Sequence, residues 1–241
     1  MKNKIPKIKY QKSKWRFILF SLCLLLSTFY FIREVNSQMK IKLPKPRSSG
    51  GMSLSETLNK RKSWRSFSSE ALKLEEVSQI LWSAGGKRLD AVSGATRTYP
   101  SAGATYPLEI YLLVGKGGVE GLEEGIYLYL WDENSLEKIS SSDVRRDLAS
   151  ACLGQTFISQ APISVIIAAE YVRTTGYYGQ RGIRYVHMEV GNVTQNLHLV
   201  AEELGLATVI VGAFSDEKVK RVLGLPNNLE PLTVMPLGYK K

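Results

Sequence analysis

Cysteine and histidine are almost absent from this 241-residue chain, and their positions exclude several kinds of site. Cys23 lies inside an apolar run, so Cys152 has no partner for a disulfide or a CxxC redox centre in the rest of the chain. His187 and His198 fall eleven residues apart on one face of a predicted helix, roughly 16 Å along its axis. This separation is too large for a shared metal ion, and neither an HExxH motif nor a Ser-His-Asp order is present. We therefore predict no metal site.

Acidic side chains are scarce at the N-terminus. Residues 1–50 contain twelve Lys or Arg and one acid, Glu34, which gives this part a net charge of +11. Residues 51–241 hold the other 20 basic and 21 acidic side chains, so their net charge is −1. A nucleic-acid-binding protein needs a basic face on its folded domain, whereas the excess charge here precedes that domain. We predict no nucleic-acid partner.

The N-terminal cations are followed by a long apolar run. Together with Trp15, residues 17–32 are just long enough to cross a bilayer as a helix. We predict a basic cytoplasmic leader at residues 1–16, a transmembrane anchor at 17–32, a tether at 33–52 and one folded domain at 53–241. The higher density of cations before the run predicts a single-pass membrane protein whose domain lies outside the cytoplasm. The alternative is a cleavable signal peptide ending near Ser37.

The folded domain shows alternating strand and helix patterns. Strands are predicted at residues 108–114, 126–131, 163–169, 208–211 and 232–235. A capping box at Ser53 opens a short helix, and further helices are predicted at residues 74–84, 144–153, 184–204 and 216–223. The helix at 184–204 has the clearest apolar stripe, formed by Val186, Val190, Val193, Leu197, Val200 and Leu204. Gly191 within it suggests the close approach of another backbone.

Four segments of the domain carry candidate site residues. Between Pro100 and Pro107 the side chains of Ala102, Gly103 and Ala104 are small or absent, so main-chain amides can approach a flat ligand there. Residues 61–67 read RKSWRSF, which combines the cations and hydroxyls that a phosphate monoester requires. Nearer the C-terminus follow VIVGAF at residues 209–214 and PLGYKK at residues 236–241. Taken in order, these segments resemble the FMN-dependent nitroreductase superfamily.

Within that superfamily the chain most resembles the SagB-type (ThcOx-like) dehydrogenases, which oxidise azolines to azoles during peptide maturation. The resemblance runs from about Leu54 to the C-terminus and includes residues 121–127, 151–155, 179–185 and 191–197. It implies an α+β, nitroreductase-like fold in which helices flank a central mixed β-sheet. It also implies an FMN cofactor and a homodimer, with the helix at 184–204 central in the protomer and along the interface.

The same resemblance implies the residues of the site. The FMN phosphate and ribityl chain would be held by Arg61, Lys62, Ser63 and Arg65. The flavin ring would be covered, from the other protomer, by Pro100, Ser101, Ala102 and Gly103. Main-chain amides of the Val211, Gly212 and Ala213 segment would approach N5 and O4, and Lys240 would add a phosphate contact.

One departure from the family pattern bears on the reaction. SagB-type dehydrogenases have a lysine-tyrosine pair before a glycine-rich turn, and here that place reads Tyr177-Tyr178-Gly179. We predict Tyr178 and Tyr177 as catalytic loop residues, although a tyrosine is a poor base at neutral pH. The leading prediction is a membrane-tethered FMN oxidoreductase with two-electron, ping-pong turnover of a small or peptide-borne substrate. The alternatives are an azoline-to-azole peptide dehydrogenase and a non-catalytic subunit of a membrane complex that binds flavin or another planar ligand.

Overall fold

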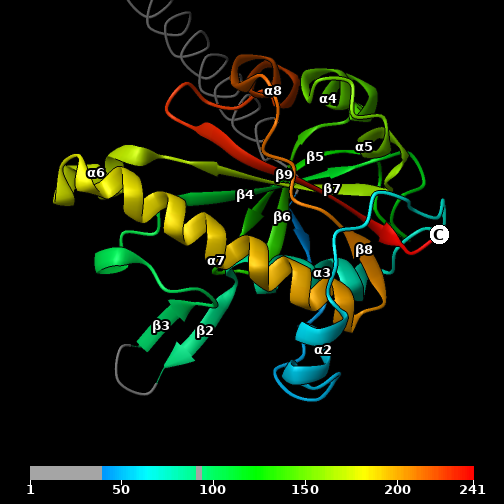
Figure 1. The fold of residues 1–241 in the computed structure, drawn as a ribbon, viewed down its shortest axis with the longest axis horizontal. Helices are drawn as coiled ribbons and strands as arrows, with labels where there is room; N and C mark the ends of the chain where they lie inside the picture. Colours follow the sequence, from blue (N-terminus) through cyan, green and yellow to red (C-terminus); the bar gives the residue numbers. More distant parts are fainter. Residues whose placement is uncertain (1–39, 91–93) are drawn as a thin grey trace, which may run out of the picture. The chain divides into compact units, whose positions relative to one another are not determined.

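The computed structural model describes residues 40–90 and 94–241, and residues 40–241 belong to one compact unit (Figure 1). The leader and the apolar run at residues 17–32 lie outside the described residues, so the membrane anchor stays a prediction. Within the described ranges, no helix has the length and apolarity needed to cross a membrane.

A seven-stranded sheet forms the centre of the unit, in the order β1-β6-β5-β4-β7-β9-β8 (Figure 1). Its strands are β1 (Lys40–Lys42), β4 (Leu108–Val114), β5 (Gly125–Leu130), β6 (Ser135–Ser140), β7 (Ile163–Ala169), β8 (Leu206–Thr208) and β9 (Glu230–Tyr239). A separate hairpin is formed by β2 (Lys87–Asp90) and β3 (Gly94–Arg97). Every ladder of the large sheet is antiparallel, so the predicted mixed sheet is wrong.

Both faces of the sheet are buried. Side chains alternate between the two faces along each strand, and each face packs in its own apolar cluster. On β4, Ile110 and Leu112 belong to one apolar cluster, whereas Tyr111 and Leu113 belong to a second cluster on the opposite face. The first face is covered by α3 (Leu74–Gly85) and α7 (Arg181–Glu203), and the second by α4 (Arg145–Ala151) and α8 (Asp216–Leu223). The remaining helices are α2 (Leu54–Lys60), α5 (Phe157–Gln160), α6 (Tyr171–Tyr178) and the short 3₁₀ turn η1 (Ala102–Ala104).

The predicted helix at 184–204 is α7, which begins one turn earlier than expected and crosses one face of the sheet (Figure 1). Val186, Val190, Val193 and Leu197 are buried, as the stripe predicts. A side-chain carbon added at Gly191 would meet nothing within 4 Å, so no other backbone of the described unit approaches it closely. His198 is buried, whereas His187 is exposed.

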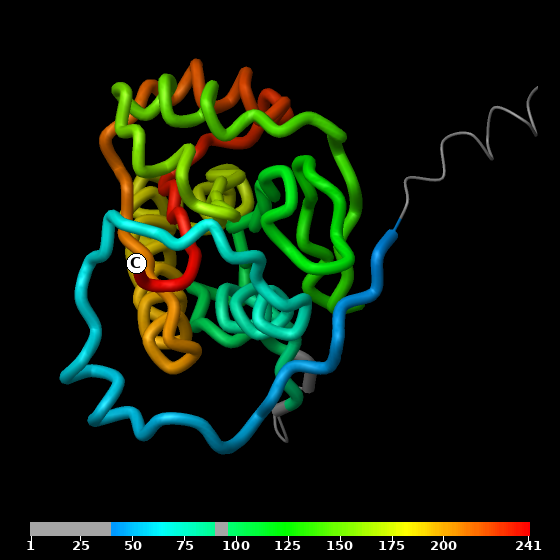
Figure 2. The backbone as a smooth tube through the Cα atoms, turned by 90° about the vertical axis from the view of Figure 1, so that its right-hand side faces the viewer, coloured from blue at the N-terminus to red at the C-terminus, as the bar shows by residue number. Residues whose placement is uncertain are grey.

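The second half of the predicted tether packs onto the domain. β1 pairs with β6, and Leu43 is only 4% exposed. The Arg47 amide donates a hydrogen bond to Gln79 Oε1 on α3 at 2.8 Å. Figure 2 shows the chain continuing around the outside of the unit, in blue and cyan, until it reaches the C-terminal strand. The compact unit therefore begins at Lys40 rather than at residue 53.

We expect a protein that starts at residue 53 to melt about 5 to 10 °C below one that starts at Lys40. The shorter chain loses β1 and the burial of Leu43, which together stabilise the fold by about 2 to 3 kcal/mol. Differential scanning calorimetry of the two proteins measures this difference. Equal melting temperatures would mean that residues 40–52 do act as a tether.

Candidate functional site

The basic segment predicted for phosphate binding follows α2 and lies along the edge of the sheet. Ser53 caps α2 by accepting a hydrogen bond from the Glu56 amide at 3.2 Å. Beyond the helix, the Trp64 amide donates to Thr208 O of β8 at 2.9 Å. Phe67 then forms a bridge with Lys240. These backbone contacts bring the segment and the end of the chain together.

Trp64 is the centre of this group of cations. Lys62 Nζ lies 3.8 Å from the centroid of the Trp64 ring, and Lys240 Nζ lies 5.6 Å from it. Arg65 lies above the ring of Phe157 at 6.0 Å. The structure thus places Lys240 beside the segment that precedes it by more than 170 residues. Lys240 also pairs with Glu202 of α7 at 2.8 Å.

The cations of the segment are available to an anion. In the part of the chain that the structure describes, no ion pair joins Arg61, Lys62 or Arg65 to a carboxylate. Trp64 Nε1 is buried and has no acceptor among the described residues. This set of unpaired donors fits a phosphate group. Ser63 is exposed, as a hydroxyl that contacts a ligand must be.

His198 of α7 contributes no positive charge to this group at neutral pH. Burial, and then the charge of Arg61, lower the pKa of His198 below its usual range. Its Nδ1 atom is buried without a hydrogen-bond partner in the described chain. Arg61 therefore faces a neutral ring and not a competing acid.

The segment predicted to approach the flavin ring lies next to the cations. Val211 is buried and exchanges two backbone hydrogen bonds with Val234, at 2.9 and 3.0 Å. Gly212 and Ala213 are exposed, and their amides have no acceptor within residues 40–90 and 94–241. Phe157 packs between the cluster that contains Phe67 and the cluster next to Phe214. Two free amides thus lie beside the basic segment.

The loop from Pro100 to Gly103 lies against Tyr178. Gly103 has a positive φ of 58°, and a side-chain carbon there would be 2.6 Å from Tyr178 Oη. Only glycine allows both this conformation and this contact. The ring of Tyr178 packs edge-on against Tyr185, with centroids 5.1 Å apart.

Tyr177 and Tyr178 end α6, so the predicted loop at these residues is wrong. The two residues differ in their surroundings. Tyr177 is 80% exposed, whereas Tyr178 is half-buried. Of the two predicted catalytic residues, only Tyr178 is held by its neighbours in the protomer.

The predicted residues form two groups that contact α7 (Figure 1) at different positions along its length. The basic group contacts the helix at Glu202, through Lys240. The loop contacts it at Glu189, through Ser101 and Ala102. Thirteen residues separate these two positions, about 20 Å along the helix. A single protomer therefore does not bring the two groups together.

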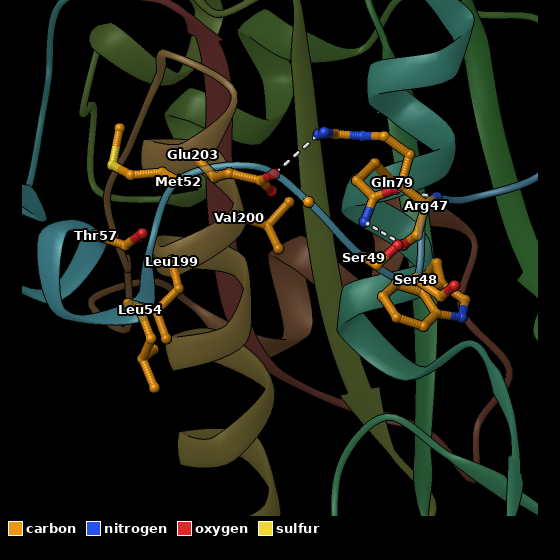
Figure 3. A pocket seen from close by; sticks show the side chains of 12 residues that line it. Arg47, Ser48, Ser49, Met52, Leu54, Thr57, Gln79, Leu199, Val200 and Glu203 are labelled. Carbon is orange, nitrogen blue, oxygen red and sulfur yellow. Dashed lines mark hydrogen bonds and ion pairs between the residues drawn. The ribbon is translucent and has the colours of Figure 1, made fainter.

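Figure 3 shows a pocket that contains none of the predicted site residues. Its volume is about 260 Å³, and its lining comes from residues 47–57, α3 and α7. Across it, Arg47 Nη2 pairs with Glu203 Oε1 at 2.9 Å, and Gln79 Nε2 donates to Arg47 O at 3.3 Å. The polar groups of Arg47, Gln79 and Glu203 are therefore bonded to one another and not directed at a ligand.

Comparison of the sequence with known proteins identifies the family of this chain. Residues 58–239 match the sequence profile of the nitroreductase family, which is most of the chain. The chain belongs to the nitroreductase family. It is 47% identical over 202 residues to MJ1384 of Methanocaldococcus jannaschii, named as a nitroreductase, and this match covers 84% of the chain and 97% of MJ1384. The family resemblance read from the motifs is thereby confirmed, and the protein is a nitroreductase-family oxidoreductase.

A second relative is the microcin B17-processing protein McbC of Escherichia coli. The identity is 28% over 144 residues, which are 58% of this chain and about half, 52%, of McbC. Among solved structures, a nitroreductase from Ralstonia eutropha superposes with a TM-score of 0.72 at 26% identity, over 86% of this chain and 91% of that one. The E. coli microcin synthetase McbBCD complex with truncated pro-MccB17 bound gives a TM-score of 0.65 at 24% identity, over 87% and 81% of the chains. The last similarity shows the fold alone.

Glu189 is a residue of this nitroreductase-family chain that sequence reasoning missed. It is 3% exposed on α7 and accepts hydrogen bonds from Ser101 and Ala102. The sequence feature that could have identified it is a carboxylate inside the apolar stripe, directly before Val190. An unpaired charge there would cost free energy, which indicates a hydrogen-bond partner.

Proposed function

We propose that the protein is an FMN-dependent oxidoreductase that works as a homodimer on a small or peptide-borne substrate. The observation that carries this proposal is the segment of cations without carboxylate partners at residues 61–65, to which Lys240, paired with Glu202, is added at the Trp64 ring. Bound FMN would supply two-electron transfer, which suits ping-pong turnover of a donor and then an acceptor. The protein's part is to hold the cofactor, exclude water and supply a proton.

The phosphate would be held by Arg61, Lys62, Ser63 and Arg65, with Lys240 beside them. Arginine offers forked donors that match phosphate oxygens, and no protein carboxylate among the described residues occupies those of Arg61 or Arg65. The exposed amides of Gly212 and Ala213 follow Val211, whose cluster packs on Phe157 below Arg65, and would donate to the edge of the flavin ring.

A dimer would unite the two groups that α7 holds apart. If a twofold axis passes midway between these two positions and relates two antiparallel α7 helices side by side, Glu189 of one helix lies near Glu202 of the other. The loop from Pro100 to Gly103 would then cover a flavin held by the partner's basic segment. Exposed apolar side chains along α6 and α7, Val172, Ile183 and Met188, support such a contact.

Tyr178 would hold or donate a proton at its Oη atom. Its ring is fixed by Tyr185, and its hydroxyl lies at the Gly103 loop. Azoline-to-azole oxidation of a peptide is the second candidate, which the similarity to the microcin B17-processing protein favours. In that reaction the place of the family's lysine is taken by Tyr177, whose side chain is exposed next to Tyr178.

We expect the purified full-length protein to be yellow and to bind FMN, and Arg61→Ala to weaken the binding about ten- to a hundredfold. Loss of a charge-assisted contact costs about 1.5 to 3 kcal/mol. Lys62→Ala should have a smaller effect, because Lys62 is exposed and lies on Trp64. Fluorescence titration of the apoprotein with FMN measures each dissociation constant.

Arg146→Ala is the matched control for this titration, because Arg146 is an exposed cation of α4 outside both groups. It should leave the FMN affinity unchanged. A colourless protein without FMN affinity would refute the proposed function. Equal effects of Arg61→Ala and Arg146→Ala would make residues 61–65 a solvated surface instead of a phosphate site.

A further inference from the structure

Glu189 is a buried carboxylate whose role the proposed function does not include. It lies on the face of α7 that packs against the domain, between the buried residues Val186 and Val190. Burial raises the pKa of Glu189 above its usual range, while the bonds from Ala102 and Ser101 and the charge of Arg97 oppose that rise. Burial of a carboxyl group at such a position costs free energy unless hydrogen bonds compensate for the lost contacts with water.

One oxygen of Glu189 makes all the contacts that the structure describes. Oε1 accepts from Ser101 Oγ at 2.9 Å and from the Ala102 amide at 3.0 Å. Ser101 Oγ in turn accepts from the Tyr106 amide at 2.9 Å, so its single proton points to Glu189. Oε2 is buried and has no partner in the described chain. The carboxylate therefore closes a chain of hydrogen bonds through the loop.

The loop that these bonds hold has an unfavourable backbone. Gly103, Ala104 and Tyr106 all have positive φ, at 58°, 54° and 44°. For residues other than glycine this conformation persists only where neighbouring contacts enforce it. Contacts that hold it include those of Ser101 and Ala102 with Glu189, Thr105 Oγ1 with Thr174 Oγ1 at 2.8 Å, and the hydrogen bond from Arg173 Nη1 to Tyr106 O at 3.2 Å.

The held loop sets the position of Tyr178. Since a side-chain carbon at residue 103 would be 2.6 Å from Tyr178 Oη, the backbone of Gly103 lies directly against the hydroxyl. A change of φ at Gly103 or Ala104 would move this wall. The ring of Tyr178 also packs on Tyr177 and Tyr185, so the hydroxyl is placed by these ring contacts on one side and by the Gly103 backbone on the other.

We propose that Glu189 is a positioning residue, which fixes the Ser101 to Ala104 backbone and thereby places the Tyr178 hydroxyl for proton transfer. This inference rests on the proposed function. Glu189 acts through Ser101 and Ala102 and does not itself touch the reacting atoms.

The test compares Glu189→Leu, Glu189→Gln and Ser101→Ala in the full-length protein, each with and without Tyr178→Phe. Turnover is followed by stopped flow, with photoreduced enzyme and nitrofurazone as the acceptor. Glu189→Leu should slow reoxidation about ten- to a hundredfold, because both loop donors lose their acceptor. In that background, adding Tyr178→Phe should cost less than about tenfold more, because the hydroxyl is already misplaced. Glu189→Gln keeps a carbonyl acceptor and should retain the wild-type response to Tyr178→Phe.

Hydrogen–deuterium exchange of the apoprotein gives a readout that needs neither cofactor nor substrate. Peptides that cover residues 100–106 should exchange faster in Glu189→Leu and Ser101→Ala than in the wild type and in Glu189→Gln. Ser101→Ala removes one hydroxyl from a half-buried position, so it keeps the test decisive if Glu189→Leu does not fold. Glu203→Leu is the control, since this carboxylate of α7 pairs with Arg47 away from the loop.

The outcomes separate this inference from the proposed function. Loss of FMN binding in the wild type would refute the proposed function. A yellow, active wild type in which Glu189→Leu and Tyr178→Phe act additively, with unchanged exchange at residues 100–106, would refute only the role of Glu189. Equal loop exchange in Glu189→Gln and Glu189→Leu would show that the acceptor is not what holds the loop.

Discussion

Tyr178→Phe should slow turnover about 10²- to 10⁴-fold while FMN stays bound, which is the usual cost of removing a positioned acid or base. The substitution removes only the hydroxyl that lies against Gly103, and the ring can still pack on Tyr185. Nitrofurazone is a suitable acceptor, because conversion of a nitro group to a nitroso group takes up two electrons and two protons and releases water. Stopped-flow measurement of each half-reaction shows which one needs the proton.

Tyr177→Phe is the matched control for Tyr178→Phe, because it removes the same hydroxyl from a side chain that is 80% exposed in the adjacent position. Its turnover with nitrofurazone should stay within about twofold of the wild type. If Tyr178→Phe reoxidises as fast as the wild type and Tyr177→Phe does not, the two assignments must be exchanged. If neither is slower, the end of α6 serves packing alone.

Mixing two inactive variants should restore about a quarter of the wild-type activity. One chain carries Arg61→Ala with Lys62→Ala, and the other carries Tyr178→Phe. If each site combines a basic segment from one protomer with a Tyr178 from its partner, a mixed dimer contains one fully wild-type site. Half of the dimers from an equal mixture are mixed, and one of their two sites works, which gives roughly a quarter. Coexpression and an assay without added FMN measure this recovery.

The reciprocal mixture is the control for this experiment. A chain that carries all three substitutions is mixed equally with the wild type. A site shared between protomers leaves roughly a quarter of the activity, from wild-type homodimers alone, whereas a site within one protomer leaves roughly half. No recovery in the first mixture together with half in the second would place the whole site inside a single chain. In that case α7 would have to bend or shift to bring the loop at Glu189 and the basic segment at Glu202 together.

The sequence was sufficient to predict the strands that carry β-branched runs and the helix with a regular stripe. β4 and β7 were predicted with their observed ends, since each is a short apolar run bounded by turn residues. The predicted end of β9 was too early, because the strand continues through Pro236, which lacks an amide donor, to Tyr239. The directions of the strands could not be predicted, because they depend on how the chain returns across the sheet and not on residue pattern.

In the candidate site, too, features with a local sequence pattern were predicted and features that depend on distant contacts were not. The order of the motifs was enough to select Arg61, Lys62 and Lys240, of which the fold brings the two lysines to Trp64. The helix that ends at Tyr178 was not predicted, because Gly176 and Gly179 indicate a turn, and burial of Thr174 overrides that local preference. Glu189 was missed because its partners lie 87 and 88 residues earlier in the chain. Contacts at such separations leave no local pattern.

The place of β9 also determines when this protein can fold. β9 lies between β7 and β8 and contains Glu230–Tyr239, so it is synthesised after every other strand of the described sheet. Until it is available, β7 has no neighbour on one side, and β8, which pairs only with β9 in the described sheet, has none at all. The partly made chain therefore exposes an apolar sheet edge, and the basic segment at Trp64 lacks Lys240. Completion of the sheet requires β9, and chains that end before residue 230 should remain sensitive to protease.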